Sequence, residues 1–524
     1  MFNLIAVWNI FLKMLMVNET IPTDQIIPID QVDQVIPIDQ IDQVIQELID
    51  FINNLNSIYE GKNVPFCYPG TYLDEDLKYF ISEIIRKNPN MIGCHTHDDK
   101  DGKYIGEGGF DDFQKMERDA IRWIADIIGD ITADGYFCSG GTEGNIMGMW
   151  IAREYLTNLI KDRIINDILG HIDMSGLDDT HINKIRSNIS KKDIEENISD
   201  IKEYLEVINE ARIKFRDDIK NIHITAIVPK TIHYSVLKAF DILGIVDFVF
   251  VKNTNDLIID MNDLRKVIDK KVEEGTTSFI IAATAGICIS GGIDPITEIS
   301  DMIDEYYEKD EHPDFYFHVD AAFAGFTVPF LTNEVQIGFK NKNVKSIVID
   351  GHKMGLAPYP SGIFMCKKDY QTHITRDVSY IRGGHDNTIS GSRSAIGPIS
   401  SWYLFKKYGY DGYRKLAQDC IDHRDKLVRL LTERDIPGVT ILKCDPYVNF
   451  MPVIISVKDG KIPTELTEGV LRDYQMRSDT FMINGEMKNV YKVCIMRHTF
   501  NHIEQFVDDL ETAITSWHNL HPID

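Results

Sequence analysis

The segments Phe315-Tyr-Phe-His-Val-Asp-Ala-Ala322 and Asp350-Gly-His-Lys353 indicate an open α/β sheet in the middle of the chain. Apolar residues fill most of the first segment and most of the run Val344–Asp350, so each is predicted to contain a short strand. Each strand carries polar residues at its carboxyl end, which is the edge at which open α/β sheets bind ligands. We therefore expect the aspartate of the first segment and the lysine of the second to lie in one site.

A lysine and an aspartate at one sheet edge suit the chemistry of pyridoxal phosphate. A lysine amine can hold the cofactor aldehyde as a Schiff base, and an aspartate can keep the pyridine nitrogen protonated. The protonated ring then accepts electrons from a bond broken at Cα. Lys353 and Asp320 fit these two roles. Each residue alone has an ordinary structural explanation, a surface lysine or a helix-capping aspartate, so the prediction depends on the motifs that accompany them.

A glycine-rich loop precedes an apolar, helix-like run in the segment Phe137-Cys-Ser-Gly-Gly-Thr-Glu-Gly-Asn145, which is followed by Ile146–Ile151. Glycines let backbone N–H groups approach an anion, and the start of a helix adds a partial positive charge. A phosphate could therefore lie against Gly140, Gly141 and Thr142. The structural alternative is an ordinary helix N-cap formed by a serine or threonine of the loop.

Two further segments could contact a cofactor ring. His233 lies in Thr231-Ile-His-Tyr-Ser-Val-Leu-Lys238, after a strand-like run, and its imidazole could stack on the pyridine face. A histidine packed at a strand-to-helix turn is the structural alternative. Thr284 lies near the end of the apolar strand Phe279–Ala285, where its hydroxyl could bond to the cofactor or belong to a structural turn.

The order of these motifs resembles that of the group II pyridoxal-phosphate-dependent amino acid decarboxylases. The likeness is closest to the archaeal-type tyrosine/aspartate decarboxylases, with the sphingosine-1-phosphate lyases as near relatives, and it covers roughly residues 60 to 515. It implies the PLP-dependent transferase fold type I, an aspartate-aminotransferase-like α/β fold. This fold combines a large domain, built on a mixed or parallel sheet, with a small C-terminal α+β domain.

The resemblance also implies how this chain binds its cofactor, pyridoxal 5'-phosphate (PLP). Lys353 resembles the Schiff-base lysine, Asp320 the partner of the pyridine nitrogen, and His233 the catalytic histidine stacked on the ring. The other implied cofactor contacts are the phosphate-side residues Gly141, Thr142 and His352, the small residue Ala322 under the other ring face, and the neighbours Thr284 and Asp350. A phosphate would repel an aspartate, so Asp350 is interpreted as orienting the loop or a neighbouring donor.

Two residues downstream of Lys353 complete the predicted site. In the relatives, a tyrosine on a mobile loop protonates Cα after carbon dioxide has left, and Tyr380 in Asp377-Val-Ser-Tyr-Ile-Arg-Gly-Gly-His385 matches it. An ordinary loop tyrosine is the alternative. Arg393, in Thr388-Ile-Ser-Gly-Ser-Arg-Ser-Ala395, could bind a carboxylate or brace a dimer, because a bidentate guanidinium suits both tasks.

The composition of the whole chain is typical of a globular protein. The 524 residues are 44% hydrophobic and 26% charged, and the net charge of -26 argues against nucleic acid or an anionic membrane as the main partner. The eight cysteines are scattered without a Cys-x-x-Cys pair, which predicts reduced thiols and a cytoplasmic location. Cys94-His-Thr-His97 offers too few ligands for a metal site, so no metal is predicted and the segment is assigned to the substrate entrance.

The predicted domain organisation has four parts. They are a low-complexity N-terminal arm at residues 1–50, a helical segment at 51–125 that contributes to a dimer, a large PLP-binding domain at 126–375 with a charged helical insertion at 157–220, and a small C-terminal domain at 376–524. In the arm, the nine-residue segment Ile27–Val35 recurs as Ile36–Val44, and two copies are too few for a solenoid. The apolar residues 1–17 fall short of a membrane span.

These observations predict a homodimeric enzyme that uses PLP to decarboxylate an L-amino acid through a Schiff base on Lys353. The resemblance favours an aromatic or acidic substrate and an active site at the subunit interface. Two alternatives stay open. One is a carbon–carbon lyase of the sphingosine-1-phosphate lyase type, which would release an aldehyde, and the other is a non-catalytic binding protein with this fold. The motifs do not identify the amino acid.

Overall fold

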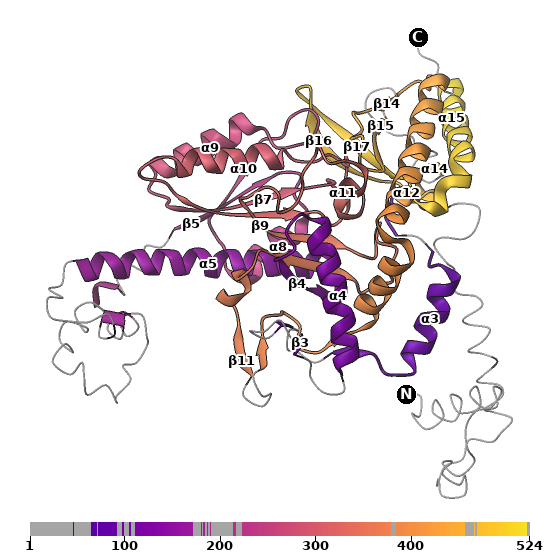
Figure 1. Ribbon diagram of the computed structural model, residues 1–524. Coiled ribbons are helices and arrows are strands. Elements are labelled where there is room, and N and C mark those ends of the chain that lie inside the picture. The colour runs from indigo at the N-terminus through magenta and orange to yellow at the C-terminus, as the bar shows by residue number, and fades with distance from the viewer. Residues whose placement is uncertain are drawn as a thin grey trace, which may run out of the picture. The chain divides into compact units, whose positions relative to one another are not determined.

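The computed structural model describes residues 64–70, 72–91, 97–98, 104–105, 110–170, 223–378, 384–455 and 469–520, together with a few isolated residues (Figure 1). The chain divides into two units, residues 1–62 and residues 63–524, and every element given below belongs to the second. The predicted repeat arm and most of the predicted insertion lie outside the described residues. The first part of that insertion continues the helix α5, Gly141–Gly170.

A seven-stranded mixed sheet forms the centre of the second unit. Its order is β4 (Asp134–Cys138), β10 (Gly362–Cys366), β9 (Val344–Asp350), β8 (Asp314–Asp320), β7 (Ser278–Thr284), β5 (Ile224–Pro229) and β6 (Phe248–Val251). β10 is antiparallel to both of its neighbours, and the other pairs are parallel. The predicted strands that precede Asp320 and Lys353 are the parallel neighbours β8 and β9, so their carboxyl ends meet at one edge.

Helices cover both faces of this sheet, because its strands are apolar on both faces (Figure 1). Alternate residues along a strand point to opposite faces. Ile281 and Phe317 therefore join the core formed with α4 (Asp111–Ile127), α9 (Met261–Glu273) and α10 (Ile296–Tyr307). Their neighbours Ile280 and Tyr316 join the core formed with α5 and α8 (Tyr234–Leu243). The result is a three-layer α/β architecture.

Glycines in α5 let this helix lie close to β8 and β9. A Cβ added at Gly144 would lie 2.2 Å from Val348 Cγ2, and one at Gly148 would lie 2.5 Å from His318 Nδ1. Both distances are far below van der Waals contact, so a larger residue would push the helix away from the sheet. The two glycines are about one helical turn apart, and Asn145 beside them is fully buried against the strands.

A four-stranded antiparallel sheet lies towards the end of the chain. Its order is β14 (Val439–Ile441), β15 (Phe450–Ile455), β17 (Glu486–Cys494) and β16 (Arg477–Ile483). Its core is shared with α15 (Ile503–Leu520) and with the second half of α12 (Ile396–Arg434), which breaks at Gly409 with φ of 56°. This sheet and its helices form the predicted α+β part, whereas the domain boundaries at residues 125 and 375 remain predictions.

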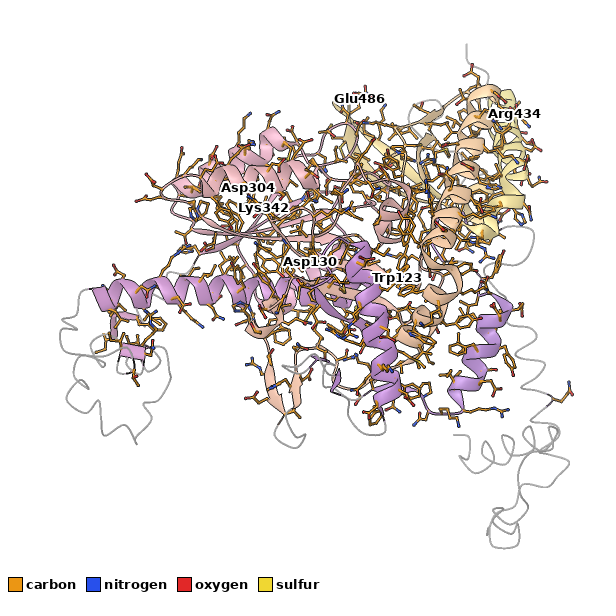
Figure 2. All side chains as sticks on the ribbon, viewed as in Figure 1. Trp123, Asp130, Asp304, Lys342, Arg434 and Glu486 are labelled. Atoms are coloured by element: carbon orange, nitrogen blue, oxygen red, sulfur yellow. The ribbon has the colours of Figure 1, made fainter. Side chains whose placement is uncertain are left out.

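Contacts with α12 fix the N-terminal helices of this unit. Trp123 of α4, labelled in Figure 2, stacks on Phe405 of α12 with ring centroids 4.1 Å apart. Asp74 precedes α3 (Glu75–Ile85) and accepts hydrogen bonds from three side chains, those of Lys407, Tyr408 and Arg497. Burial raises the pKa of this carboxyl, but the hydrogen bonds outweigh burial and lower the pKa to about 2.

The remaining short elements include α11 (Val328–Leu331), α14 (Val470–Asp473) and three ribbons, which pair β1 (Asn90–Met91) with β13 (Arg393–Ser394), β2 (His97–Asp98) with β3 (Tyr104–Ile105), and β11 (Arg376–Val378) with β12 (Gly384–Asp386). Within the described ranges, no helix is long and apolar enough to cross a membrane. The same part of the chain holds no cluster of three His, Cys, Asp or Glu side chains that could bind a metal.

Candidate active site

A cavity of about 210 Å³ lies at the carboxyl ends of β7, β8 and β9. Nine of the ten predicted catalytic and cofactor-binding residues line it, and these are Gly141, Thr142, His233, Thr284, Asp320, Ala322, Asp350, His352 and Lys353. The tenth, Tyr380, lies outside the described residues. The fold thus brings five separate segments of the chain to one place, whereas the role of each residue stays a prediction.

Lys353 forms an ion pair in the cavity wall. Its Nζ lies 2.9 Å from Asp350 Oδ2, and His352 Nε2 lies 3.7 Å from the same oxygen. Burial lowers the pKa of Lys353, but the charge and hydrogen bond of Asp350 outweigh burial, and the pKa is raised. Burial also lowers the pKa of His352. The carboxylate of Asp350 therefore holds the lysine amine at a fixed place beside the histidine.

Asp320, at the end of β8, is held by two hydrogen-bond donors. Asn145 Nδ2 donates to Oδ2 at 2.8 Å, and the backbone N–H of Ala322 donates to Oδ1 at 3.1 Å. A buried carboxylate needs such donors, since it has lost most of its hydration. Asp320 is only 4% exposed. The two donors therefore replace part of the lost hydration and fix the plane of the carboxylate.

Asn145 connects Asp320 to a second, fully buried histidine. Because a carboxylate can only accept, Asn145 turns its amide N–H towards Asp320 and its carbonyl oxygen towards His318 Nε2, which is 2.9 Å away. His318 Nε2 therefore carries the proton, and Nδ1 accepts from the Ser346 hydroxyl at 2.7 Å. Burial lowers the pKa of His318 to about 3. The ring is neutral near pH 7 and acts as a fixed support for Asn145.

The second amide N–H of Asn145 is connected to His233 through the Ser235 hydroxyl. It donates to Ser235 Oγ at 2.8 Å, so the Ser235 hydroxyl is free to donate to His233 Nδ1 at 2.7 Å. His233 precedes α8 as its N-cap, and Nδ1 also accepts from the backbone N–H of Ser235. Burial lowers the pKa of His233, and the charge of Asp320 opposes this shift. His233 thus packs at a strand-to-helix turn and also lines the cavity.

The glycine loop places the start of α5 at the cavity. The first N–H groups of a helix have no partners within the helix, and together with the helix dipole they attract an anion. Glu143 holds the loop by accepting from the Ser139 N–H at 2.9 Å and from its hydroxyl at 2.7 Å. A Cβ added at Gly141 would lie 3.1 Å from Asp350 Oδ2. Glycine therefore permits the close approach of loop and wall.

Several polar atoms of the cavity wall fit a bound PLP. Thr284 Oγ1, His352 Nδ1 and Asp350 Oδ1 are buried and have no hydrogen-bond partner within the described part of the chain. Buried polar atoms are normally paired, so these three fit a polar ligand. A phosphate would find donors at the start of α5 and at His352. A pyridine nitrogen would find the carboxylate of Asp320, and an aldehyde would find the amine of Lys353.

Sequence reasoning missed several residues of this site. Asn145, Cys288, Phe323 and Tyr359 also line the cavity, and His318 stands behind it. Helical and strand periodicity could have found two of them. Asn145 lies four residues after Gly141 in one helix, and His318 lies two residues before Asp320 on one strand face. The others lie in loops, where no periodicity applies.

Arg393 is not among the residues that line the cavity. Its Nη2 lies 2.9 Å from Glu117 Oε2, and both side chains are buried. Glu117 also accepts from the Phe137 N–H at 2.9 Å, and the guanidinium lies 5.2 Å from the Tyr136 ring centroid. The carboxylate that Arg393 binds here therefore belongs to its own chain. The pair connects the segment before α12 to α4 and to β4.

Comparisons with known proteins point to the same chemistry. The pyridoxal-dependent decarboxylase conserved domain matches residues 210–441. The probable L-tyrosine/L-aspartate decarboxylase of Methanosphaera stadtmanae is 31% identical over 294 residues, which cover 55% of this chain and 69% of that protein. The tryptophan decarboxylase of Clostridium sporogenes is 27% identical over 449 residues, which cover 82% of this chain and 86% of that protein.

A solved structure confirms the predicted fold class. The sphingosine-1-phosphate lyase of Burkholderia pseudomallei has a TM-score of 0.60 at 15% identity, with 92% of each chain covered. At this identity the likeness concerns the fold alone, PLP-dependent transferase fold type I. The predicted resemblance to group II decarboxylases, with these lyases as near relatives, is confirmed as well. The sequence matches show that the chain belongs to the pyridoxal-dependent decarboxylase family, the PLP-dependent carboxy-lyases.

Proposed function

We propose that this protein decarboxylates an aromatic or acidic L-amino acid with PLP held as a Schiff base on Lys353. The observation that carries the proposal is the convergence of Lys353, Asp320 and His233 on one cavity from three distant segments. Relatives named as tyrosine/aspartate and tryptophan decarboxylases support the substrate class. When bound, PLP supplies an electron-accepting ring that stabilises the charge left at Cα as carbon dioxide departs.

In this proposal the residues that line the cavity contact different parts of the cofactor. Asp320, oriented by Asn145 and the Ala322 N–H, binds the protonated pyridine nitrogen. His233 places its neutral ring on one face of the pyridine. The remaining contacts are Ala322 under the other face, His352, Gly141 and Thr142 at the phosphate, and Thr284 as a hydroxyl donor at the rim. Asp350 keeps the Lys353 amine in place.

Tyr380 is proposed to return a proton to Cα. A phenol within reach of Cα can act as a general acid. Tyr380→Phe should then slow decarboxylation and increase the fraction of product lost through transamination. We would measure the ratio of amine to transamination product for both forms. An unchanged ratio would remove Tyr380 from the mechanism.

Release of labelled carbon dioxide tests the proposed function. The PLP-loaded protein would be incubated with carboxyl-labelled tyrosine, tryptophan, aspartate and glutamate. Release should depend on Lys353 and should be lost in Lys353→Ala. Lys266→Ala is the matched control, because Lys266 is an exposed lysine of α9 that does not line the cavity. Equal release by Lys353→Ala and the wild type would refute the assignment of Lys353.

The same experiment separates the alternatives. A carbon–carbon lyase would release an aldehyde from a phosphorylated amino alcohol and no carbon dioxide from any amino acid. A binding protein would do neither, although borohydride could still fix PLP on Lys353. Carbon dioxide release that requires Lys353 excludes both alternatives at once.

We further propose a homodimer with the active site at the subunit interface, in the cytoplasm. Tyr359 supports the interface, because this aromatic residue lines the cavity and is 66% exposed in the single chain. The seven described cysteines are free thiols, which supports a reducing compartment. Sedimentation velocity should give twice the mass of one chain, and cell fractionation would test the location.

A further inference from the structure

The Lys353 ammonium group lies over the face of an aromatic ring, that of Phe323. Its Nζ is 3.7 Å from the ring centroid, which is the shortest distance between a cation and a ring in the described part of the chain. Phe323 comes three residues after Asp320, the last residue of β8, and its side chain lines the cavity. The predicted cofactor contacts do not include this ring, although it contacts the lysine that is proposed to hold PLP.

Two neighbours fix the position of the Phe323 ring. Phe450 of β15 meets it edge-on, with ring centroids 4.9 Å apart and an interplanar angle of 73°. Gly286, in the loop after β7, has φ of 86°, and a Cβ added there would lie 2.9 Å from Phe323 Cβ. The loop therefore approaches Phe323 as closely as a glycine permits. Because the ring is packed on both sides, it stays beside the amine of Lys353.

The ring supplies part of what a buried ammonium group needs. An ammonium has three N–H donors, and the ion pair that the structure gives Lys353 is the one with Asp350 Oδ2 at 2.9 Å. The Lys353 side chain is only 14% exposed, so water replaces little of the missing hydration. The face of an aromatic ring carries negative charge density and attracts a cation, most strongly where water is excluded. The contact with Phe323 therefore favours the charged form of the amine.

Other charged or titratable groups also face Lys353. The carboxylates of Asp350 and Asp320 favour its charged form. Lys492 opposes them, since its Nζ lies 5.2 Å from the same Phe323 centroid and adds a second positive charge. The remaining groups lie in the cavity wall, and these are His233, His352 and Cys288. Burial lowers the pKa values of the two imidazoles, so both rings are neutral near pH 7. Phe323 thus acts on Lys353 together with the two carboxylates.

The exchange of amines on the cofactor gives this contact a role in the reaction. A bond forms from the substrate nitrogen to the aldehyde carbon, and the bond from that carbon to Nζ breaks. Two protons pass from the substrate ammonium to Nζ, so the total charge of the two nitrogens is unchanged. A freed neutral amine has a lone pair that can attack the same carbon again, whereas an ammonium has none.

We propose that Phe323 is a positioning residue that holds the freed Lys353 as an ammonium ion beside Asp350 and so delays its return to the cofactor. This inference rests on the proposed function and adds a residue to it. Phe323 acts through Lys353 and not through the substrate. Its removal should therefore affect the free lysine and the ligands that displace the lysine, and no others.

The reactivity of the free amine tests the inference without turnover. The probe is formaldehyde with cyanoborohydride, which methylates an amine only in its unprotonated form. Mass spectrometry of the apoprotein at one fixed pH gives the rate at Lys353 relative to that at the exposed Lys266. Phe323→Leu should raise this relative rate roughly 3- to 30-fold, which corresponds to about 0.7–2 kcal/mol. Phe323→Tyr keeps the ring and should retain the wild-type rate. Phe323→Met, which also lacks a ring, replaces Phe323→Leu where the leucine variant does not fold.

Phe450→Leu is the matched control. It removes a ring that packs on Phe323, and the cation nearest to that ring is Lys492 at 5.4 Å rather than Lys353. The rate at Lys353 should therefore stay at the wild-type value. Equal rates in the wild type and Phe323→Leu would overturn the inference. Equal acceleration in Phe450→Leu and Phe323→Leu would overturn it too, because looser packing would then explain both.

Ligand binding to the PLP-loaded protein gives a second readout. The α-methyl esters of L-tyrosine and L-aspartate displace Lys353 through their amine and cannot be decarboxylated, whereas the matching esters without an amine leave Lys353 in place. In Phe323→Leu the Kd of the amino esters should rise roughly 3- to 30-fold, and the Kd of the esters without an amine should not change. An equal rise for both kinds of ester would assign Phe323 to the wall of the substrate pocket and would overturn the inference.

The inference and the proposed function fail separately. Absence of carbon dioxide release from every amino acid would refute the proposed function. Equal labelling of Lys353 in the wild type and Phe323→Leu would refute the role of Phe323. The labelling requires no turnover, so it decides that role whichever amino acid the protein uses.

Discussion

Acid should destabilise this protein measurably through the buried imidazole of His318. Burial lowers the pKa of His318 to about 3 in the folded protein, whereas a histidine in an unfolded chain titrates at about 6.5. Between these two values the unfolded state binds more protons than the folded state. The free energy of unfolding therefore falls as the pH is lowered. The stabilisation is complete above pH 6.5 and is lost progressively towards pH 3.

The size of the effect follows from the two pKa values. Each pH unit inside the window removes about 1.4 kcal/mol from the free energy of unfolding. The change from pH 7 to pH 5 starts just above the upper limit of the window, so the expected loss is about 2 kcal/mol. No allowance for solvent screening is needed, because His318 is 0% exposed.

Urea denaturation at pH 7, 6 and 5 would measure this loss, and His318→Gln supplies the comparison. Glutamine has no titrating group, so the variant should lack the His318 contribution whatever its stability at pH 7. Other buried groups titrate in both proteins and cancel in the difference. One of them is Asp294, whose pKa burial raises to about 7 and which therefore stabilises the folded state as the pH falls.

The difference in free energy of unfolding between wild type and His318→Gln should shrink by about 2 kcal/mol from pH 7 to pH 5. Parallel curves, with a constant difference at all three pH values, would refute the reasoning. They would mean that burial does not keep His318 neutral. The assignment of a single proton to Nε2 of His318, on which the directions of the hydrogen bonds around Asn145 depend, would then be wrong. Equal m values in the two proteins are required for the comparison.

Three further predictions concern two residues of α5 and the buried pair of Arg393 and Glu117. Asn145→Leu removes a donor from the buried Asp320 and should weaken PLP binding by roughly 10- to 100-fold in a fluorescence titration of the apoprotein; an unchanged Kd would contradict this role of Asn145. Gly148→Ala places a Cβ 2.5 Å from the His318 ring. It should lower the free energy of unfolding, measured in urea, by about 1–3 kcal/mol, although alanine has a helix propensity about 1 kcal/mol more favourable than that of glycine. A variant as stable as the wild type would show that α5 can shift away from the sheet. Arg393→Met leaves the carboxylate of Glu117 buried without its ion-pair partner and should lower the free energy of unfolding by about 3–5 kcal/mol. Adding Glu117→Gln should recover most of that loss. No recovery in the double variant would show that lost packing, not an unpaired charge, causes the destabilisation.

The sequence predicted the elements whose pattern is local. The runs before Asp320 and Asp350 are apolar and short, and the structure contains them as β8 and β9. Their polar ends had to meet because parallel strands present their carboxyl ends at one edge. His233 and Thr284 follow the same rule after β5 and at the end of β7. This local pattern was sufficient to bring the predicted cofactor residues to one cavity.

The hydrogen-bond network behind Asp320 could not be predicted in the same way. Asn145 and Asp320 are 175 residues apart, and Asn145 and His318 are 173 residues apart. Whether their side chains meet depends on how α5 rotates and how deeply it sits on the sheet. That depth is set by Gly144 and Gly148, which the sequence shows only as two glycines in a helical run.

Lys492 illustrates a second limit of the sequence pattern. Along β17 it is one polar residue in the run Val490-Tyr-Lys-Val-Cys494, and an alternating strand normally turns such a residue to solvent. It is buried because the four-stranded sheet lies against the loops that carry Cys288 and Phe323. Contacts of this kind come from the docking of two sheets, which no periodicity within either sheet encodes.

The donor and acceptor roles in this hydrogen-bond network require a neutral His318. Asp320 can only accept, so Asn145 must donate to it, and His318 must then donate to Asn145 from Nε2. A proton added to His318 would go to Nδ1, where the ring now accepts from Ser346, so the serine hydroxyl would have to turn away. Burial makes that proton unfavourable near pH 7. Burial of an imidazole two residues before Asp320 therefore keeps a single arrangement of donors around the carboxylate that is proposed to hold the pyridine nitrogen.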